Sequence, residues 1–207
     1  MLTGFAHGEL ILEERAAKSR ARRLKGTFPY GKLTTISDGG RNGGRPKKET
    51  FAPRAFAYNV EREDVNILFL SGHRYDRPLA SRAAGTLRLK DADDALHMEA
   101  ILTDEIMETS WARDFLAAFA AGLVMGLSPG FRIPPQSAVP DAEKIEEEDP
   151  TLGRALIRTI FAALIYELSA VTVAQYEDAE ISERNWTPSA GGVLRPAPAV
   201  AARRWRL

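Results

Sequence analysis

The residue best suited to act as a nucleophile in this sequence is Ser128, in the segment Gly126-Leu127-Ser128-Pro129-Gly130. The two glycines let a substrate carbonyl and backbone amide groups come close, and Pro129 favours an extended conformation at the serine. A serine nucleophile further requires a base within hydrogen-bond reach, a group that orients the base, and donors for the developing oxyanion. A serine between glycines is also found where two backbones merely cross closely, so this segment alone leaves both interpretations open.

The candidates for the base are the three histidines, His7, His73 and His97. His73 follows the apolar run at residues 65–70, which is typical of a buried strand, so the imidazole would be held rigidly where a substrate can reach it. The structural alternative is a loop histidine that bonds to Asp76. His97 alternates out of an apolar strand face and is better explained as a surface histidine, and nothing in the sequence anchors the segment around His7.

Composition excludes several kinds of chemistry. The chain has no cysteine, so disulfides, cysteine metal sites and a thiol nucleophile are excluded, and three histidines are too few to favour a multi-histidine metal site. We expect no cofactor and no metal. The 28 basic and 28 acidic residues balance, so no overall field favours a nucleic acid or a membrane as partner. No apolar run reaches the roughly 18–20 residues that span a bilayer, and we expect a soluble intracellular protein.

The elements that would position these residues are mostly strands. Alternating apolar residues predict a β-hairpin over residues 85–102, and an aromatic residue at every fourth position predicts a helix over 109–121. Two further strands are predicted at 156–163 and 164–173, and the second contains Glu167. The aromatic residues of the helix are Trp111, Phe115 and Phe119.

The length of 207 residues suits one domain with tails. We expect a basic N-terminal arm over residues 1–25, in which residues 10–24 form a short exposed helix or a flexible segment, and then a domain over residues 26–185. Prolines, glycines and alanines predict a flexible C-terminal tail over residues 186–207.

Five segments, taken in order, point to a family. They are Tyr30-Gly31, Glu49-Thr50-Phe51-Ala52-Pro53-Arg54-Ala55-Phe56, residues 66–73, Gly126-Leu127-Ser128-Pro129-Gly130-Phe131, and Glu167-Leu168-Ser169-Ala170-Val171-Thr172. Their order and spacing, over residues 26–178, resemble the prohead (capsid maturation) serine proteases of phages with an HK97-type capsid, which are distantly similar to herpesvirus proteases. The resemblance implies an α+β fold that is mainly β, a herpesvirus-protease-like and mostly antiparallel β-barrel flanked by helices. It also implies that His73 and Ser128 are the base and the nucleophile.

Three departures from the family pattern are expected to alter the fine geometry of the site. Pro129 replaces a common isoleucine and removes a backbone amide, and Arg54 replaces a small residue. Residues 173–175 replace the proline-alanine pair that often follows the last strand.

The third catalytic residue is a second histidine in the herpesvirus enzymes, but no histidine follows His97 here, so a carboxylate is expected. Glu167 is our choice, because it holds the family's Glu-x-Ser position in an apolar strand, where an unpaired carboxylate would be costly. The structural alternative is a Glu167 that pairs with an arginine. Asp76 and Glu99 are kept in reserve.

Backbone amides near Gly130 and Phe131, with Arg132, are candidates for stabilising the oxyanion or binding the substrate, although Arg132 is also explained as a solvent-facing arginine. The resemblance implies a serine endopeptidase that cleaves the scaffold portion of the major capsid protein, and its own ends, during prohead maturation. It would act in the host cytoplasm, self-associated inside the assembling prohead of a tailed phage or gene-transfer particle.

Two other functions are weighed against this one. The first is a catalytically degraded capsid scaffolding or assembly protein, in which Ser128 and His73 only pack. The second is a nucleic-acid binder that uses the basic residues 15–25, which zero net charge and the lack of an aromatic residue in that segment argue against.

Overall fold

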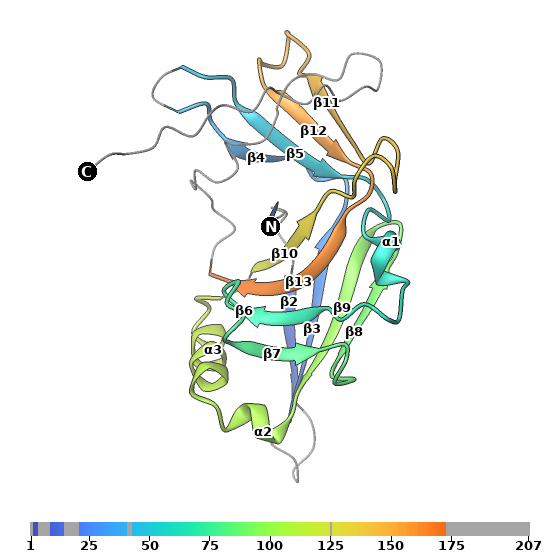
Figure 1. Ribbon diagram of the computed structural model, residues 1–207. Helices are drawn as coiled ribbons and strands as arrows, with labels where there is room; N and C mark the ends of the chain where they lie inside the picture. The colour runs from blue at the N-terminus through green and yellow to red at the C-terminus, as the bar shows by residue number, and fades with distance from the viewer. Residues whose placement is uncertain (1, 4–8, 15–20, 41–42, 125, 173–207) are drawn as a thin grey trace, which may run out of the picture.

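The computed structural model describes residues 2–3, 9–14, 21–40, 43–124 and 126–172. Strands dominate this part of the chain and form three sheets, whereas the helices are short (Figure 1). All but two of the strand pairs are antiparallel. The prediction of an α+β fold that is mainly β is confirmed.

The first sheet, which we call the site sheet, has the spatial order β1-β10-β13-β6-β7. In that order the strands span Leu2–Thr3, Gly126–Arg132, Leu164–Val171, Leu68–Ser71 and Pro78–Ser81. The central strand β13 is antiparallel to β10 and parallel to β6. It therefore brings together segments that lie far apart in the sequence.

The second sheet has the order β2-β3-β9-β8 and is antiparallel throughout. Its strands span Glu9–Glu14, Arg22–Pro29, Ala95–Leu102 and Leu87–Asp91. The pair β8 and β9 is the hairpin that the alternating apolar residues predict, and that prediction is confirmed.

The helix or flexible segment expected in the basic arm is wrong for the part described, because residues 9–14 and 22–29 form β2 and β3. Leu24 and Phe28 point into the core while Lys25 is exposed, which is the two-residue period of a strand. Burial against β9 outweighs the helix propensity of the basic residues. Residues 15–20 and the tail at 186–207 lie outside the described residues, and the domain boundaries stay a prediction.

The third sheet, which we call the upper sheet from its place in Figure 1, has the order β11-β12-β5-β4. Its strands span Glu143–Glu147, Leu156–Ile160, Lys47–Phe51 and Thr34–Ser37, and β12 is parallel to β5. In none of the three sheets do the two end strands pair with each other within the described residues, so the closed barrel implied by the resemblance is not formed there.

A cluster of phenylalanines joins the three sheets instead. Phe28 comes from β3, Phe51 from β5 and Phe131 from β10, and Phe56 precedes α1 (Ala57–Val60). The ring centroids of Phe51 lie 5.2 Å from those of both Phe28 and Phe131, in edge-to-face geometry. Burying each ring contributes about 1.5–3 kcal/mol, so this cluster is a main stabilising element between the sheets.

Two further helices follow the hairpin, α2 (Asp104–Met107) and α3 (Ser110–Ala120). The side chain of Thr109 caps α3, which confirms the helix predicted over 109–121. Trp111 Nε1 donates a hydrogen bond to the carbonyl of Pro78 at 3.0 Å, so α3 is attached to the edge strand β7. None of the described helices is long and apolar enough to cross a membrane.

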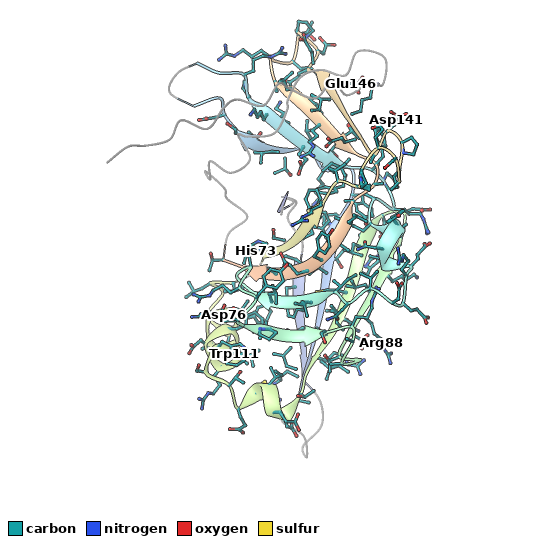
Figure 2. All side chains as sticks on the ribbon, in the orientation of Figure 1. His73, Asp76, Arg88, Trp111, Asp141 and Glu146 are labelled. Carbon is teal, nitrogen blue, oxygen red and sulfur yellow. The ribbon has the colours of Figure 1, made fainter. Side chains whose placement is uncertain are left out.

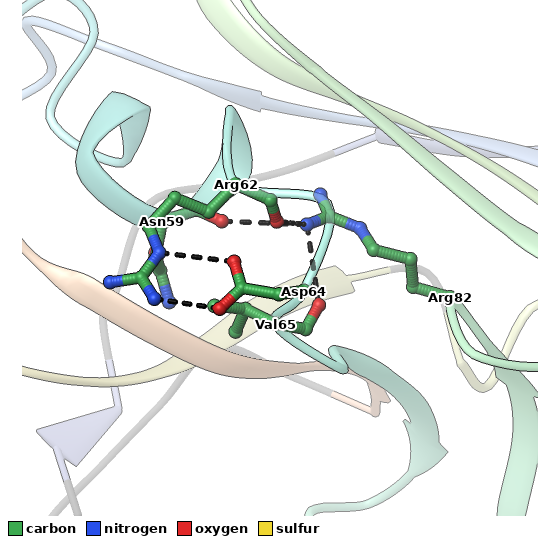
Figure 3. Close-up of polar contacts among 5 residues, drawn as sticks. All are labelled: Asn59, Arg62, Asp64, Val65 and Arg82. Carbon is green, nitrogen blue, oxygen red and sulfur yellow. Dashed lines mark hydrogen bonds and ion pairs between the residues drawn. The ribbon is translucent and has the colours of Figure 1, made fainter.

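Arg82 holds the connection between α1 and β6 (Figure 3). Its guanidinium donates to the carbonyl oxygens of Val60 at 2.8 Å, Arg62 at 2.7 Å and Val65 at 3.3 Å. Figure 3 shows the bonds to Arg62 and Val65. These charge-assisted bonds tie three backbone carbonyls of this segment to one side chain. The segment that leads into β6 is therefore fixed in place.

Candidate active site

His73 stands just beyond the end of β6, in a turn with unusual backbone geometry. Gly72 has φ 64° and His73 has φ 59°, so a non-glycine residue adopts the left-handed conformation. The backbone N–H of His73 donates to Ser169 Oγ at 2.9 Å, which helps to hold this conformation. Such a conformation persists only where the surroundings enforce it, and it is concentrated at functional sites.

The ring of His73 contacts the carboxylate of Glu167. Nδ1 of His73 and Oε1 of Glu167 are 2.8 Å apart, and the other carboxylate oxygen accepts a hydrogen bond from Ser169 Oγ at 2.6 Å. Since a carboxylate accepts hydrogen bonds, Nδ1 carries the proton when the imidazole is neutral, and Nε2 is then an acceptor. Glu167 is fully buried, and the described residues offer no hydrogen-bond partner to the buried Nε2 of His73. Figure 2 labels His73 among the side chains of this part of the molecule.

Ser128 lies on the same face of the site sheet. In the register between β10 and β13, Ser128 is opposite Ser169 and Gly130 is opposite Glu167. Residues directly opposite in an antiparallel pair project to the same side of the sheet. The sheet therefore brings Ser128, Glu167 and the turn of His73 to one surface, where Ser128 is only 1% exposed.

Gly130 is explained by the carboxylate beside it. A Cβ atom at Gly130 would lie 2.0 Å from Oε1 of Glu167 and 2.7 Å from Cδ, well inside contact distance. Only glycine leaves room for the carboxylate in its present position. This close approach comes from a neighbouring strand, whereas the sequence suggested close approach by a substrate.

The family model that describes caudovirus prohead serine proteases matches residues 34–190. The chain belongs to this family. His73, Ser128 and Glu167 all lie within the matched residues, while β1, β2 and β3 precede them. No curated protein and no solved structure matches the chain.

Membership makes the protein a serine protease of phage capsid maturation, which acts on capsid proteins in the prohead. The resemblance drawn from the five sequence segments is thereby confirmed at the level of the family.

A β-bulge shapes the protease next to Glu167. Gly130 is opposite Glu167 but Phe131 is opposite Ile165, so Tyr166 is an extra residue in β13. The side-chain amide of Asn59 holds this point, because its Nδ2 donates to the carbonyl of Ile165 at 2.6 Å and its Oδ1 accepts from the Ile165 N–H at 3.1 Å. The bulge thus has a fixed anchor in α1.

The other residues predicted to assist catalysis occupy different environments. Phe131 is fully buried and its ring packs in the core, so only its backbone is available to the site. Arg132 is exposed, with its guanidinium carbon 5.6 Å from the centre of the Tyr166 ring. Nearby, burial and the charge of Glu167 raise the pKa of Tyr75, and Arg132 opposes that shift. Tyr75 therefore lies within electrostatic reach of both the buried carboxylate and Arg132.

The two alternatives to Glu167, the carboxylates of Asp76 and Glu99, form ion pairs away from the ring of His73. Asp76 forms an ion pair with Arg74 at 2.9 Å, and hydrogen bonding to that guanidinium lowers the pKa of Asp76. Glu99 pairs with Arg23 at 2.7 Å in the second sheet. Glu167 contacts His73 and not an arginine among the described residues, so neither structural alternative, a His73 bonded to Asp76 or a Glu167 bonded to arginine, is the arrangement found.

His97 lies on the surface, as the sequence suggests, with its Nε2 3.5 Å from Asp94. His7 lies outside the described residues. The residue that sequence reasoning missed is Ser169. A signal was present, because Glu167 and Ser169 are two positions apart in one strand and so share a face.

Proposed function

We propose that Ser128 is the nucleophile of this protease, His73 its general base and Glu167 the group that orients and stabilises the base. The observation that carries this proposal is the 2.8 Å contact between His73 Nδ1 and Glu167 Oε1, with Nε2 left as an acceptor. Ser128 projects from the same face of the sheet. This is the order of roles that serine hydrolysis requires, assembled on a mainly β fold.

In the proposed mechanism, Nε2 of His73 takes the hydroxyl proton of Ser128 as Oγ bonds to the substrate carbonyl carbon. The carboxylate of Glu167 stabilises the imidazolium that forms. His73 then gives its proton to the leaving nitrogen, the carbon–nitrogen bond breaks, and an acyl-enzyme ester remains. Water attacks the ester, again with His73 as base, and restores Ser128.

Stabilisation of the oxyanion is proposed to come from backbone amides at Gly130 and Phe131, with Arg132 binding the substrate or supporting the oxyanion. The exposed guanidinium of Arg132 beside Tyr166, within electrostatic reach of Tyr75, supports a role at the approach to the site. The positive charge there would favour substrate groups that carry negative charge.

The substrates are proposed to be the scaffold portion of the major capsid protein and the ends of the protease itself, with the protease self-associated in the assembling prohead. Family membership supports this proposal, because these proteases act on capsid proteins.

The test is co-expression of the chain with its capsid protein, followed by intact-mass spectrometry, for wild type, Ser128→Ala and Ser37→Ala. Ser37 is an exposed serine of β4 and serves as the matched control. Wild type and Ser37→Ala should trim the capsid protein, and Ser128→Ala should leave it full length. Continued cleavage by Ser128→Ala contradicts the nucleophile, and assembled shells that no variant cuts would favour the scaffolding alternative.

A further inference from the structure

We infer that Ser169 is a positioning residue of this protease, which locks the turn of His73 and the carboxylate of Glu167 into one unit. The inference rests on the proposed function, in which those two residues serve catalysis. It assigns a role to a hydroxyl that would not itself touch the substrate.

The argument begins with a closed ring of hydrogen bonds. Ser169 Oγ accepts from the backbone N–H of His73 at 2.9 Å and donates to Oε2 of Glu167 at 2.6 Å. Oε1 of the same carboxylate contacts Nδ1 of His73 at 2.8 Å. One hydroxyl thus links the backbone of His73 to the carboxylate that orients its ring. The backbone and the ring of His73 are therefore both held by residues of β13.

Because this ring of hydrogen bonds is buried, the hydroxyl of Ser169 is hard to replace. Glu167 and Ser169 are both fully buried, so no solvent takes over a lost bond. An alanine would leave one carboxylate oxygen and one backbone N–H without this partner, at a site where unsatisfied polar groups are costly. A hydroxyl also does what few side chains do, since it donates and accepts through one atom.

The backbone of His73 gives the second reason. Its left-handed φ of 59° is unfavourable for a residue with a Cβ, and the bond from its N–H to Ser169 directly opposes relaxation. Loss of that bond lets the turn move. A displacement of about 1 Å at a catalytic group costs on the order of 100-fold in rate, even when substrate binding is intact.

The chain offers a matched control in Thr109. Its hydroxyl also accepts from a backbone N–H, that of Ala112 at 3.4 Å, and donates to a carbonyl, that of Ile106 at 2.7 Å. It does so at the start of α3, outside the proposed site. Thr109→Ala therefore removes a hydroxyl with the same pattern of bonds without touching His73.

The experiment compares Ser169→Ala, Ser169→Thr and Thr109→Ala in the full chain, using cleavage kinetics and NMR of isotope-labelled histidine. In Ser169→Ala we expect kcat to fall about 10- to 100-fold, as for other supporting hydrogen-bond partners, with KM nearly unchanged. The hydrogen-bonded Nδ1–H signal of His73, assigned by its absence in His73→Gln, should broaden or disappear. Ser169→Thr should restore both, and Thr109→Ala should change neither.

Unchanged kcat and an unchanged Nδ1–H signal in Ser169→Ala would overturn the inference. If Ser169→Ala does not fold, the threonine variant decides, because a folded Ser169→Thr that lacks the signal contradicts the role of the hydroxyl. The NMR readout needs no turnover. If the Nδ1–H signal is lost in Ser169→Ala but Ser128→Ala keeps full activity, the proposed nucleophile is wrong while the positioning role of Ser169 stands.

Discussion

Two buried glutamates, one in the site sheet and one in the upper sheet, show how the same side chain serves different ends. Glu49 of β5 is buried and accepts from the guanidinium of Arg158 at 3.0 Å, and Arg158 also binds Glu143 at 2.6 Å. Glu167 of β13 is equally buried but is bonded to His73 and Ser169. Burial and charge alone therefore do not identify a working carboxylate.

The difference lies in the donors. An arginine keeps its proton under all ordinary conditions, so the pair with Arg158 is a permanent structural contact. An imidazole can both accept and donate a proton, so the pair with His73 can take part in proton transfer. Substitutions that treat the two glutamates alike should therefore give opposite results.

The largest effect is expected from replacing each glutamate by glutamine. In Glu167→Gln the amide can donate to Nδ1, which would move the ring proton of His73 to Nε2 and prevent it from acting as a base. We expect cleavage to fall by about 10⁴-fold, as when the acid of a serine triad becomes an amide, with folding retained. Intact-mass kinetics and urea unfolding measure the two quantities.

Glu49→Gln should show the reverse. It leaves Arg158 with one carboxylate fewer in a buried position, and breaking such a pair costs about 3–5 kcal/mol of unfolding free energy. Folded Glu49→Gln should cleave at the wild-type rate. Equal losses of activity in both glutamine variants would contradict the prediction that Glu167 serves catalysis and Glu49 serves stability.

A second comparison uses two glycines that lie against glutamates. A Cβ at Gly130 would lie 2.0 Å from Glu167 Oε1, and one at Gly153 would lie 2.2 Å from Glu148 Oε2. Neither glycine has a positive φ, so alanine tests space and not backbone strain.

We expect Gly130→Ala to lower cleavage by about 100-fold, because the displaced carboxylate no longer orients His73. Gly153→Ala should alter the melting temperature without altering cleavage, since Glu148 is bound to Lys48 and to the Ala155 N–H, outside the proposed site. Matched kinetics and melting curves for the two variants check this prediction. A fully active Gly130→Ala would show that the carboxylate tolerates displacement.

The smallest effect concerns another buried carboxylate, Asp91, whose Oδ1 accepts a hydrogen bond from the hydroxyl of Tyr30. Burial raises the pKa of Asp91. The folded protein then holds this proton more tightly than the unfolded chain, so stability is lost as pH rises from the unfolded pKa, about 3.9, through the folded one. Asp91→Asn has no carboxyl group at this position, so its stability does not fall in this way as the pH rises.

The stability of Asp91→Asn relative to wild type should therefore increase between about pH 4.5 and about pH 7.5. Urea midpoints at the two pH values measure the change, with no effect expected on cleavage. A relative stability that falls with pH would contradict the assigned direction.

Elements with strong local patterns were predictable from the sequence. The aromatic residues at every fourth position indicate α3, and the alternating apolar residues indicate the hairpin of β8 and β9. β3 was missed, because its apolar residues are spaced by bases and glycine and only the neighbouring β9 makes one face buried. Local patterns also could not predict that the sheets stay open, because this depends on which distant strands pair.

The site was predictable as separate residues but not as an arrangement. Ser128, His73 and Glu167 each lie in a recognisable segment, yet their arrangement depends on the pairing of β13 with β10 on one side and with β6 on the other. The role of Gly130 is set by a side chain 37 positions away, and that of Ser169 by a turn 96 positions before it. Spacing along the chain carries no information on such contacts.

The burial of Ser128 has a practical consequence for chemical probes. A hydroxyl that is 1% exposed cannot meet an organophosphorus or sulfonyl fluoride reagent until the strands around it open. The speed of labelling would then report how often the protein opens and not how reactive the oxygen is.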